Sequence, residues 1–561
     1  MFVSRFEKIV ECRIVSFLRR NHVWTKNRIV KSPYRDIEIP NFSVSEYILS
    51  NIHKWENKTA VVCGVTDRHY TYGQLYKHSR ILGAHLRRNF KLQDGDAVAV
   101  MMPNLPEYPI TLLGILSAGG VVTTLNPVYT SYEVQRQIAM SDTKLIFTIP
   151  EVVPVIQEAL CLAKKNIPII VMDVENNRQD GTISYKEIIN NTNVDLSILK
   201  EIKRDSEDVS FLLYSSGTTG LPKGVELTNR NIVANCKQQD TELRMYDFTT
   251  ETNQDTVLAI IPMYHSYGLT VVALHKLAVG LKLVTMPKFK PETFVKALEK
   301  HSIDSFYLAP PLMLFLSSYP GVKAKHMERC RSVTIGGAPL PKADIEAFLN
   351  KVERDVHVGQ AYGLTETSPI ATLAPLGFKN YTSVGYAIPN VELRIIDSES
   401  NNLGPNEVGE LLIKGPNVMK GYKNNPEANK QALVEDGWFR SGDLASISDD
   451  GVLTIADRLK ELIKVNAYQV APAELESVLK EHPDVFDAAV VPIPDPITGE
   501  KPKAFVVLKD NKNTSDNDIL AFVSKRVAPY KRIKEIAFLN EIPKNPSGKI
   551  MRRTLVEKYC S

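Results

Sequence analysis

The chain has 561 residues, of which 43% are hydrophobic and 24% charged, the composition of an ordinary globular protein too long for one core. Its formal net charge of +4 is small for this length and argues against nucleic-acid binding. Six scattered cysteines without a C-x-x-C pair favour reduced thiols inside a cell over a disulfide framework or a zinc site.

Positive charge is concentrated at the N-terminus. Residues 1–35 contain nine Lys or Arg but only Glu7 and Glu11, so this segment carries +7. Apolar residues recur there at helical spacing, namely Phe6, Val10, Ile14, Phe17 and Leu18. Three interpretations stay open: a mitochondrial targeting helix, which the two acidic residues oppose, a helix on an anionic membrane surface, or a helix that is solvated or packed on the core.

From Ile37 to about residue 330, apolar strands alternate with amphipathic helices, which predicts an α/β architecture with partly parallel sheets. Lys58–Gly64 and Tyr70–Arg88 are typical of these strand and helix segments. The uncharged window Tyr108–Leu125 is shorter than a membrane span requires, because Pro109 suits a helix start and Gly119-Gly120 a helix end. We expect a buried helix followed by a strand.

The stretch Tyr214–Gly224 (YSSGTTGLPKG) follows the apolar strand Val209–Tyr214, and a helix capped by Thr228 or Asn229 is expected soon after it. Glycines and hydroxyl residues make the loop flexible and rich in hydrogen-bond donors, and Lys223 adds a positive charge. Such a loop suits a polyphosphate, although a plain Ser/Gly turn has a similar composition. It is not a Walker A loop, because a proline precedes the lysine.

Several later blocks carry glycines, aromatic residues and carboxylates in a characteristic order. They are Ile260–Gly268 (IIPMYHSYG), Gly336–Leu340 (GGAPL), Gly359–Thr367 (GQAYGLTET), Trp438–Asp443 (WFRSGD), Asp457–Glu461 (DRLKE) and Pro546–Ile550 (PSGKI). Together with the loop, these blocks resemble the adenylate-forming enzymes: acyl- and aryl-CoA synthetases, 4-coumarate–CoA ligases and beetle luciferases. The resemblance covers roughly residues 36 to 555.

The resemblance implies an ATP site in which Tyr362 stacks on adenine, Thr365 contacts the α-phosphate and Asp443 binds the ribose hydroxyls. Glu366 would help to hold Mg²⁺, as a hard carboxylate ligand should. The full set of implied nucleotide-binding residues is Ser215, Ser216, Gly217, Thr218, Thr219, Lys223, Gly337, Gln360, Tyr362, Thr365, Asp443, Arg458, Lys460 and Lys549.

For the other substrates, the resemblance implies a carboxylate pocket and a CoA path. The pocket residues would be His265, Tyr267, Gly337 and Gly363, and the CoA residues Lys288, Asn466 and Ala467. A structural histidine and an exposed lysine remain the plain alternatives for positions 265 and 288. Relatives commonly have lysine and glycine where this chain has Asn466 and Ala467, so a weaker CoA step is expected.

The implied reaction has two steps. A fatty or aromatic carboxylate attacks the α-phosphorus of ATP to give an acyl-adenylate and pyrophosphate, and CoA then displaces AMP. Catalysis would be mainly positioning and charge stabilisation, carried by Lys549, His265, Thr365 and Glu366.

Other functions stay open: an adenylating enzyme with a weak CoA step or another acceptor, as in luciferases, a non-catalytic nucleotide-binding relative, or a P-loop NTP-hydrolysing switch. Retention of the residues Lys223, Glu366, Asp443 and Lys549 opposes a loss of chemistry. The proline before Lys223, and the absence of Ser or Thr after it, oppose the switch.

The expected organisation is a basic extension (1–35), an AMP-binding domain with a small β unit (36–458) and a mobile α+β C-terminal domain (459–561) with its hinge near Lys460. Helices are predicted over Pro472–Glu481 and Asn517–Val527. An intracellular location is expected: cytoplasmic, or mitochondrial or membrane-associated through the basic segment. The final Tyr559-Cys560-Ser561 departs from the peroxisomal S-K-L signal.

Overall fold

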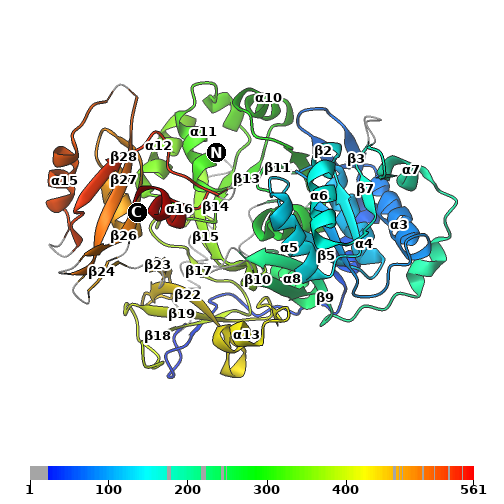
Figure 1. Ribbon diagram of the computed structural model, residues 1–561, viewed down its shortest axis with the longest axis horizontal. Coiled ribbons are helices and arrows are strands. Elements are labelled where there is room, and N and C mark those ends of the chain that lie inside the picture. Colours follow the sequence, from blue (N-terminus) through cyan, green and yellow to red (C-terminus); the bar gives the residue numbers. More distant parts are fainter. Residues whose placement is uncertain are drawn as a thin grey trace.

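The computed structural model describes residues 23–173, 179–215, 223–241, 246–247, 249–458, 463–465, 468–470, 472–495, 498–510, 512–527, 531–545 and 548–560. Within these ranges the strands form four sheets, and Figure 1 shows three of them in the large part of the molecule and the fourth in a smaller C-terminal unit. The predicted fold, an α/β domain with partly parallel sheets followed by a small α+β domain, is confirmed.

The first sheet has a parallel centre. Its strands in spatial order are β20 (Gly421–Tyr422), β10 (Lys223–Thr228), β9 (Val209–Ser215), β5 (Val121–Thr124), β4 (Ala97–Met101), β6 (Leu145–Thr148), β7 (Ile169–Val171) and β8 (Ile183–Ser184). Helices α3 (Tyr72–Arg88) and α4 (Glu107–Ser117) cover one face, and α5 (Ser131–Ser141) and α6 (Val153–Ala163) cover the other. Because both faces are covered, β4 is buried throughout.

The second sheet is also mostly parallel. Its strands in spatial order are β17 (Tyr386–Ala387), β16 (Ile370–Leu373), β15 (His357–Gly363), β14 (Ser332–Ile335), β13 (Ser305–Leu308), β11 (Thr256–Ala259), β12 (Lys282–Thr285), β2 (Thr59–Cys63) and β3 (His69–Thr71). Helices α10 (Pro291–His301), α11 (Pro310–Ser318) and α12 (Lys342–Val352) pack on one face. The other face shares one hydrophobic core with the first sheet, and α8 (Asn229–Gln238) and the π-helix η4 (Tyr267–Leu274), which α9 (His275–Ala278) follows, contribute to it.

Local sequence signals place several of these elements. Thr71 caps α3 and Thr228 caps α8, each through its side-chain oxygen. Helix α4 begins at Glu107, two residues before Pro109. A proline is tolerated in the first turn, because the N–H groups there have no hydrogen-bond partner within the helix. One element differs from expectation: Lys223–Thr228 is the strand β10, antiparallel to β9, so the Ser/Gly loop connects a hairpin.

The third sheet is the predicted small β unit. It contains β1 (Val30–Lys31), β18 (Glu392–Ile396), β19 (Gly409–Lys414), β22 (Trp438–Ile447) and β21 (Leu433–Val434), with β23 (Leu453–Arg458) paired to β22. The chain preceding β1 is fastened to the same unit, because the Trp24 Nε1 donates a hydrogen bond to the Ser448 carbonyl at 2.9 Å. The helix predicted within residues 1–22 lies outside the described residues.

The fourth sheet belongs to the C-terminal unit. Its strands are β25 (Tyr468–Val470), β24 (Ile463–Val465), β27 (Gly499–Leu508) and β26 (Val485–Asp495), with β28 (Glu535–Phe538) paired to β27. Its helices are α14 (Pro472–Lys480), α15 (Asp516–Ser524) and α16 (Arg552–Tyr559), so the two helices predicted here are present with C-terminal ends one and three residues earlier.

The remaining helical segments are short. They are α2 (Val44–Leu49), η1 (Ile52–Trp55), η2 (Pro150–Val152), α7 (Tyr185–Asn190), η3 (Leu196–Lys200), η5 (Ala324–Met327), η6 (Thr365–Thr367), α13 (Pro426–Ala432) and η7 (Glu435–Gly437). None of the helices in the described ranges has the length and apolar character that a membrane crossing requires.

Candidate active site

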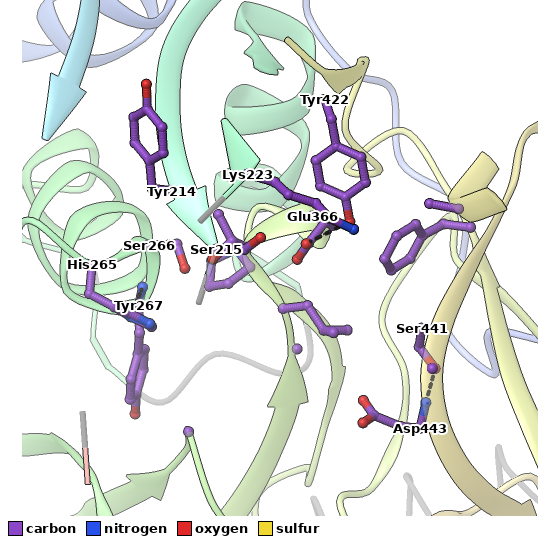
Figure 2. A pocket seen from close by; sticks show the side chains of 18 of the residues that line it. Tyr214, Ser215, Lys223, His265, Ser266, Tyr267, Glu366, Tyr422, Ser441 and Asp443 are labelled. Atoms are coloured by element: carbon purple, nitrogen blue, oxygen red, sulfur yellow. Dashed lines mark hydrogen bonds between the residues drawn. The ribbon is translucent and has the colours of Figure 1, made fainter. Parts of the chain in front are cut away.

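A cavity of about 690 Å³ lies where the three sheets of the large part meet the C-terminal unit. Its walls come from the ends of β9, β10, β15 and β22, from the start of the π-helix η4 and from the turn before α16. Figure 2 shows side chains from these separate elements pointing toward the same space. The cavity therefore collects most of the blocks that the sequence singled out.

One side of the cavity carries Ser215, at the end of β9, and Lys223, at the start of β10. The two residues are opposite each other in the hairpin register. The Lys223 ammonium lies 4.9 Å from the centre of the Tyr422 ring. The intervening loop residues predicted to bind phosphate, Ser216, Gly217, Thr218 and Thr219, lie outside the described residues.

Glu366 and Thr365 line the cavity next to this lysine. Glu366 is 7% exposed, and its Oε1 accepts a hydrogen bond from the Tyr422 hydroxyl at 2.9 Å. A carboxylate beside a lysine fits a Mg²⁺ ion that arrives with ATP, because Mg²⁺ is usually held by one or two carboxylates plus phosphate oxygens. A cluster of three or more metal-ligating side chains is absent from the described residues.

On another side, Tyr362 of β15 and Asp443 of β22 face each other. The Tyr362 hydroxyl donates a hydrogen bond to Asp443 Oδ2 at 2.6 Å, and Asp443 is only 3% exposed. The Asp443 backbone N–H donates to Ser441 Oγ at 3.1 Å, which shapes the turn before the carboxylate (Figure 2). Arg458 is opposite Asp443 in the β22–β23 register. An aromatic ring beside a buried carboxylate suits a nucleoside, with the ring on the base and the acceptor oxygens on the ribose hydroxyls.

The third side of the cavity is formed mainly by glycine residues. Gly336, Gly337 and Gly363 line it, and Gly337 has a φ of +87°, which favours glycine. A Cβ at Gly336 would lie 3.2 Å from the Tyr267 ring, and a Cβ at Gly363 would collide with a backbone carbonyl. The Tyr267 hydroxyl donates to the Thr334 carbonyl at 3.0 Å, so the ring forms a fixed wall. Gly336 therefore packs closely against this ring, and the wall beside it is glycine backbone.

His265 lies at the start of the π-helix, beside Tyr267. Burial, followed by the positive charge of Lys549, lowers the pKa of His265 to about 4, so the imidazole is neutral near pH 7. The Tyr267 backbone N–H donates to His265 Nδ1 at 3.3 Å, which assigns the proton to Nε2. A neutral imidazole with a donor Nε2–H suits a carboxylate or acyl oxygen in the cavity.

Lys549 reaches the cavity from the C-terminal unit, on a turn that Asn545 closes. The Lys549 N–H donates to Asn545 Oδ1 at 2.9 Å, and the Gly548 N–H donates to the Asn545 carbonyl at 2.8 Å. Gly548 has a φ of +81°, and a Cβ there would lie 3.0 Å from Pro311 at the start of α11. The turn is therefore pressed against the large part of the molecule, with the lysine in the cavity.

The structure does not bring every predicted residue to the cavity. Gln360 is 7% exposed, and its amide bonds to Leu340 and to the Tyr381 carbonyl, which fastens the loop after Gly337. Lys288 is exposed and away from the cavity walls. Lys460, Asn466 and Ala467 lie outside the described residues, as does the side chain of Arg458.

The cavity residues that the sequence analysis did not predict include Ser266, Tyr422 and Asn545. Ser266 is 2% exposed, and its hydroxyl has no hydrogen-bond partner among the described residues, so it is available to a ligand. Ser266 stands inside a block that was singled out, and its polarity in an apolar run was a usable signal. Tyr422 and Asn545 have ordinary loop surroundings in the sequence and gave none.

A cavity that joins the β9–β10 hairpin with Lys223, an aromatic ring beside a buried carboxylate, a wall of glycine backbone and a lysine from a second unit is suited to a nucleotide-dependent enzyme that activates a small molecule. Residues 49–423 match the AMP-binding enzyme family, and residues 474–549 match the AMP-binding enzyme C-terminal domain. The chain belongs to this family, as the sequence motifs predicted.

Individual relatives agree. The chain is 37% identical to the probable CoA ligase CCL5 of Humulus lupulus, with 95% of this chain and 96% of that protein covered. It is 37% identical to 4-coumarate–CoA ligase 3 of Oryza sativa subsp. japonica, with 94% of each covered. Among solved structures, a benzoate CoA ligase from Burkholderia xenovorans LB400 has a TM-score of 0.80 at 26% identity, with 92% of this chain and 99% of that chain covered.

These results confirm the predicted class, an AMP-forming acid–thiol ligase that works through an acyl-adenylate. Such an enzyme uses ATP, Mg²⁺, a carboxylic acid and CoA, as predicted.

Proposed function

We propose that this chain couples an aromatic or arylpropenoic acid to CoA. The observation that supports this substrate class is the aromatic ring of Tyr267, which lines the cavity next to the glycine backbone of Gly336 and Gly337. The names of two relatives, a 4-coumarate and a benzoate ligase, favour the same class. A fatty acid remains the alternative.

In the proposed first step, a carboxylate oxygen of the acid attacks the α-phosphorus of ATP, the bond to the bridging oxygen breaks, and pyrophosphate leaves. Lys223 would hold the β- and γ-phosphates, and Thr365 the α-phosphate. Mg²⁺, when bound near Glu366, would offset charge on the phosphate oxygens. Lys549 would meet the charge that develops between carboxylate and phosphate.

His265 and Ser266 are proposed to orient the acid. The Nε2–H of a neutral imidazole and an unpartnered hydroxyl can both donate to the carboxylate, and neither adds a charge that would bind the anion too tightly to react. Asp443 and Tyr362 would bind ribose and adenine. No residue of the protein needs to act as a nucleophile.

In the second step, the CoA thiol attacks the acyl carbon, and AMP leaves with the electrons of the acyl–phosphate bond. We propose that the domain boundaries predicted from the sequence, 36–458 and 459–561, mark two units that rotate about Lys460 between the steps. The slower CoA step expected from Asn466 and Ala467 also stays a proposal, as does membrane contact through the basic segment.

Carboxylate-dependent exchange of labelled pyrophosphate into ATP tests the first step. The acids to compare are benzoate, 4-coumarate and straight-chain fatty acids of increasing length, each followed by thioester formation with CoA. We expect the highest exchange with an aryl acid. Higher exchange with a long fatty acid would overturn the substrate class, and exchange without thioester would overturn the ligase proposal.

A further inference from the structure

Tyr422 lies between the two residues that are proposed to meet the polyphosphate and its metal ion. Its hydroxyl donates to Glu366 Oε1 at 2.9 Å, and its ring centre is 4.9 Å from the Lys223 ammonium. Figure 2 shows Tyr422 beside both of these side chains. One side chain therefore contacts both a cation and an anion of the site.

The position of Tyr422 is set by its backbone. Strand β20 pairs with β10, with Tyr422 opposite Val225, two residues along β10 from Lys223. The Tyr422 N–H donates to Asn429 Oδ1 at 2.6 Å, and Asn429 Nδ2 donates to the Tyr422 carbonyl at 3.0 Å. Tyr422 is 7% exposed, so its ring has little freedom to leave this place.

The same segment also holds Glu366 through the main chain, because the Met419 N–H donates to the Glu366 carbonyl at 2.8 Å. Residues 419–423 thus join the Glu366 turn to β10, which also binds Lys420 and Lys423 through backbone hydrogen bonds. The tyrosine adds a side-chain link to this main-chain bridge.

The physical effect of the ring follows from its two chemical properties. A lysine and a glutamate on the same wall attract each other. If they paired directly, each charge would offset the other and be less available to a ligand. The tyrosine hydroxyl orients the carboxylate without changing its charge, and the aromatic face attracts the ammonium without donating a counter-charge. The ring therefore holds both side chains in place without pairing them with each other.

We propose that Tyr422 is a positioning residue of the polyphosphate site, which orients Glu366 and Lys223 toward the β- and γ-phosphates of ATP and their Mg²⁺. The inference rests on the proposed function of this cavity. It assigns Tyr422 no contact with the AMP portion, which lies on the Tyr362 and Asp443 side. The inference therefore predicts that a change of Tyr422 affects the binding of ATP but not the binding of AMP.

The test compares two substitutions. Tyr422→Phe removes the hydroxyl and keeps the ring, and Tyr422→Leu removes both. Tyr386→Phe, which removes the hydroxyl of a tyrosine on β17 outside the cavity, is the matched control. Binding of ATP with Mg²⁺, of ATP without Mg²⁺ and of AMP is measured by displacement of a fluorescent nucleotide, and the unfolding temperature of each variant is recorded.

We expect Tyr422→Phe to weaken binding of ATP with Mg²⁺ about 10-fold, the scale of losing one hydrogen bond to a charged group. It should bind AMP like the parent, and its exchange reaction should need more Mg²⁺ for half-maximal rate. Tyr422→Leu should also weaken binding of ATP without Mg²⁺, because Lys223 loses the ring. The Tyr386→Phe control should match the parent throughout.

Equal losses of ATP and AMP binding in both variants would show that Tyr422 is merely structural, and a Tyr422→Phe variant identical to the parent would show that the hydroxyl has no role; either result overturns the inference. A parent protein that binds AMP and ATP equally, with no effect of Mg²⁺, would overturn the proposed polyphosphate site and the inference with it. That outcome is visible before any variant is made.

Discussion

At the scale of single residues, burial decides which side chains of the site carry a charge. His265 is buried beside Lys549, and both effects keep the imidazole neutral. Lys549 is thus the cation that the C-terminal unit adds to the cavity, and we propose that it meets the reacting groups while the histidine supplies only a hydrogen bond. Lys549 is the residue whose loss should be most specific to one step.

Lys549→Ala should lower the adenylation rate by at least ~10²-fold, the scale of losing one preorganised charge partner in an active site. Use of a pre-made acyl-adenylate with CoA should change much less, because that step needs no charge between carboxylate and phosphate. Pyrophosphate exchange and single-turnover thioester formation measure the two steps separately. The exposed Lys558 of α16 provides a control substitution, Lys558→Ala. If both steps fall equally, Lys549 has a structural role.

At the scale of elements, a buried polar cluster joins α8 to the end of the π-helix. Lys276 donates to His275 Nδ1 at 2.8 Å, and the opposite ring nitrogen bonds to Asp240 Oδ1 at 2.8 Å. The Lys276 ammonium also lies 5.0 Å and 4.6 Å from the ring centres of Tyr246 and Tyr307. The titratable side chains of Cys236 and Lys237 in α8 also lie near the cluster.

Burial lowers the pKa of Lys276 from its ordinary value of 10.5 to about 7. Between pH 7 and 10.5 the unfolded chain binds one proton more than the folded chain at this lysine. The free energy of unfolding should therefore rise with pH, by at most about 1.4 kcal/mol for each pH unit. Urea unfolding midpoints measured from pH 7 to 10 test this. Lys276→Met should lack the rise, and a variant that follows the parent at every pH would refute the assignment to Lys276.

The N-terminal segment is divided by the structure. Val30 is 1% exposed and pairs with Leu393 of β18, and Val23 is 6% exposed. Residues 30–31 are therefore part of the third sheet, and the chain from residue 23 is attached to the same unit. A deletion that is meant to test the basic segment must stop before residue 23.

Deleting residues 1–22 should leave the unfolding temperature unchanged and reduce binding to anionic vesicles, because it removes basic residues without touching β1. Deleting residues 1–31 should lower the unfolding temperature by a few degrees, since one buried valine alone contributes about 2 kcal/mol. Calorimetry and vesicle co-sedimentation measure the two effects. A shorter deletion that destabilises the protein as much as the longer one would show that residues 1–22 pack on the core.

At the scale of the whole molecule, charged side chains from the large part and from the C-terminal unit influence each other where the two parts meet. Asp344 of α12 is influenced by Lys480 and Lys544, which both pair with Asp487 of β26. Burial raises the Asp344 pKa, and the lysines oppose that rise. This contact accompanies the placement of Lys549 in the cavity.

Asp344→Lys should repel these lysines and slow adenylation about 5-fold, the effect of roughly 1 kcal/mol expected for a partly exposed charge pair. Thioester formation from a pre-made adenylate should stay unchanged or become faster, because only the arrangement with Lys549 in the cavity is weakened. The control is Glu346→Lys, a charge reversal on the same helix at a residue that pairs with Lys342 at 3.4 Å. Parallel loss of both half-reactions would contradict the interpretation.

Much of the fold and the main motifs were predictable from the sequence. The strand predicted over Val209–Tyr214 is present as β9, and Thr228 caps α8 as predicted, because apolar runs and capping side chains act over a few residues. The strand β10 was missed, since its alternation is short and a cap signal follows it at once. Gln360 was placed correctly in a site block, yet its side chain faces Leu340, because the twist and register of β15 decide which side chains reach the cavity.

The sequence by itself determined the family of this protein and its two parts of α/β and α+β type, and it predicted which blocks bind phosphate, nucleoside and acid. These properties reside in short stretches whose residue types carry the chemistry. Only the tertiary structure decided which separate residues act together. Tyr422 reaches Glu366 and Lys223, and Lys549 acts on His265, across pairings of strands and units far apart in the chain. Local periodicity holds no information about such pairings, because they depend on register and packing between elements that fold far apart in sequence.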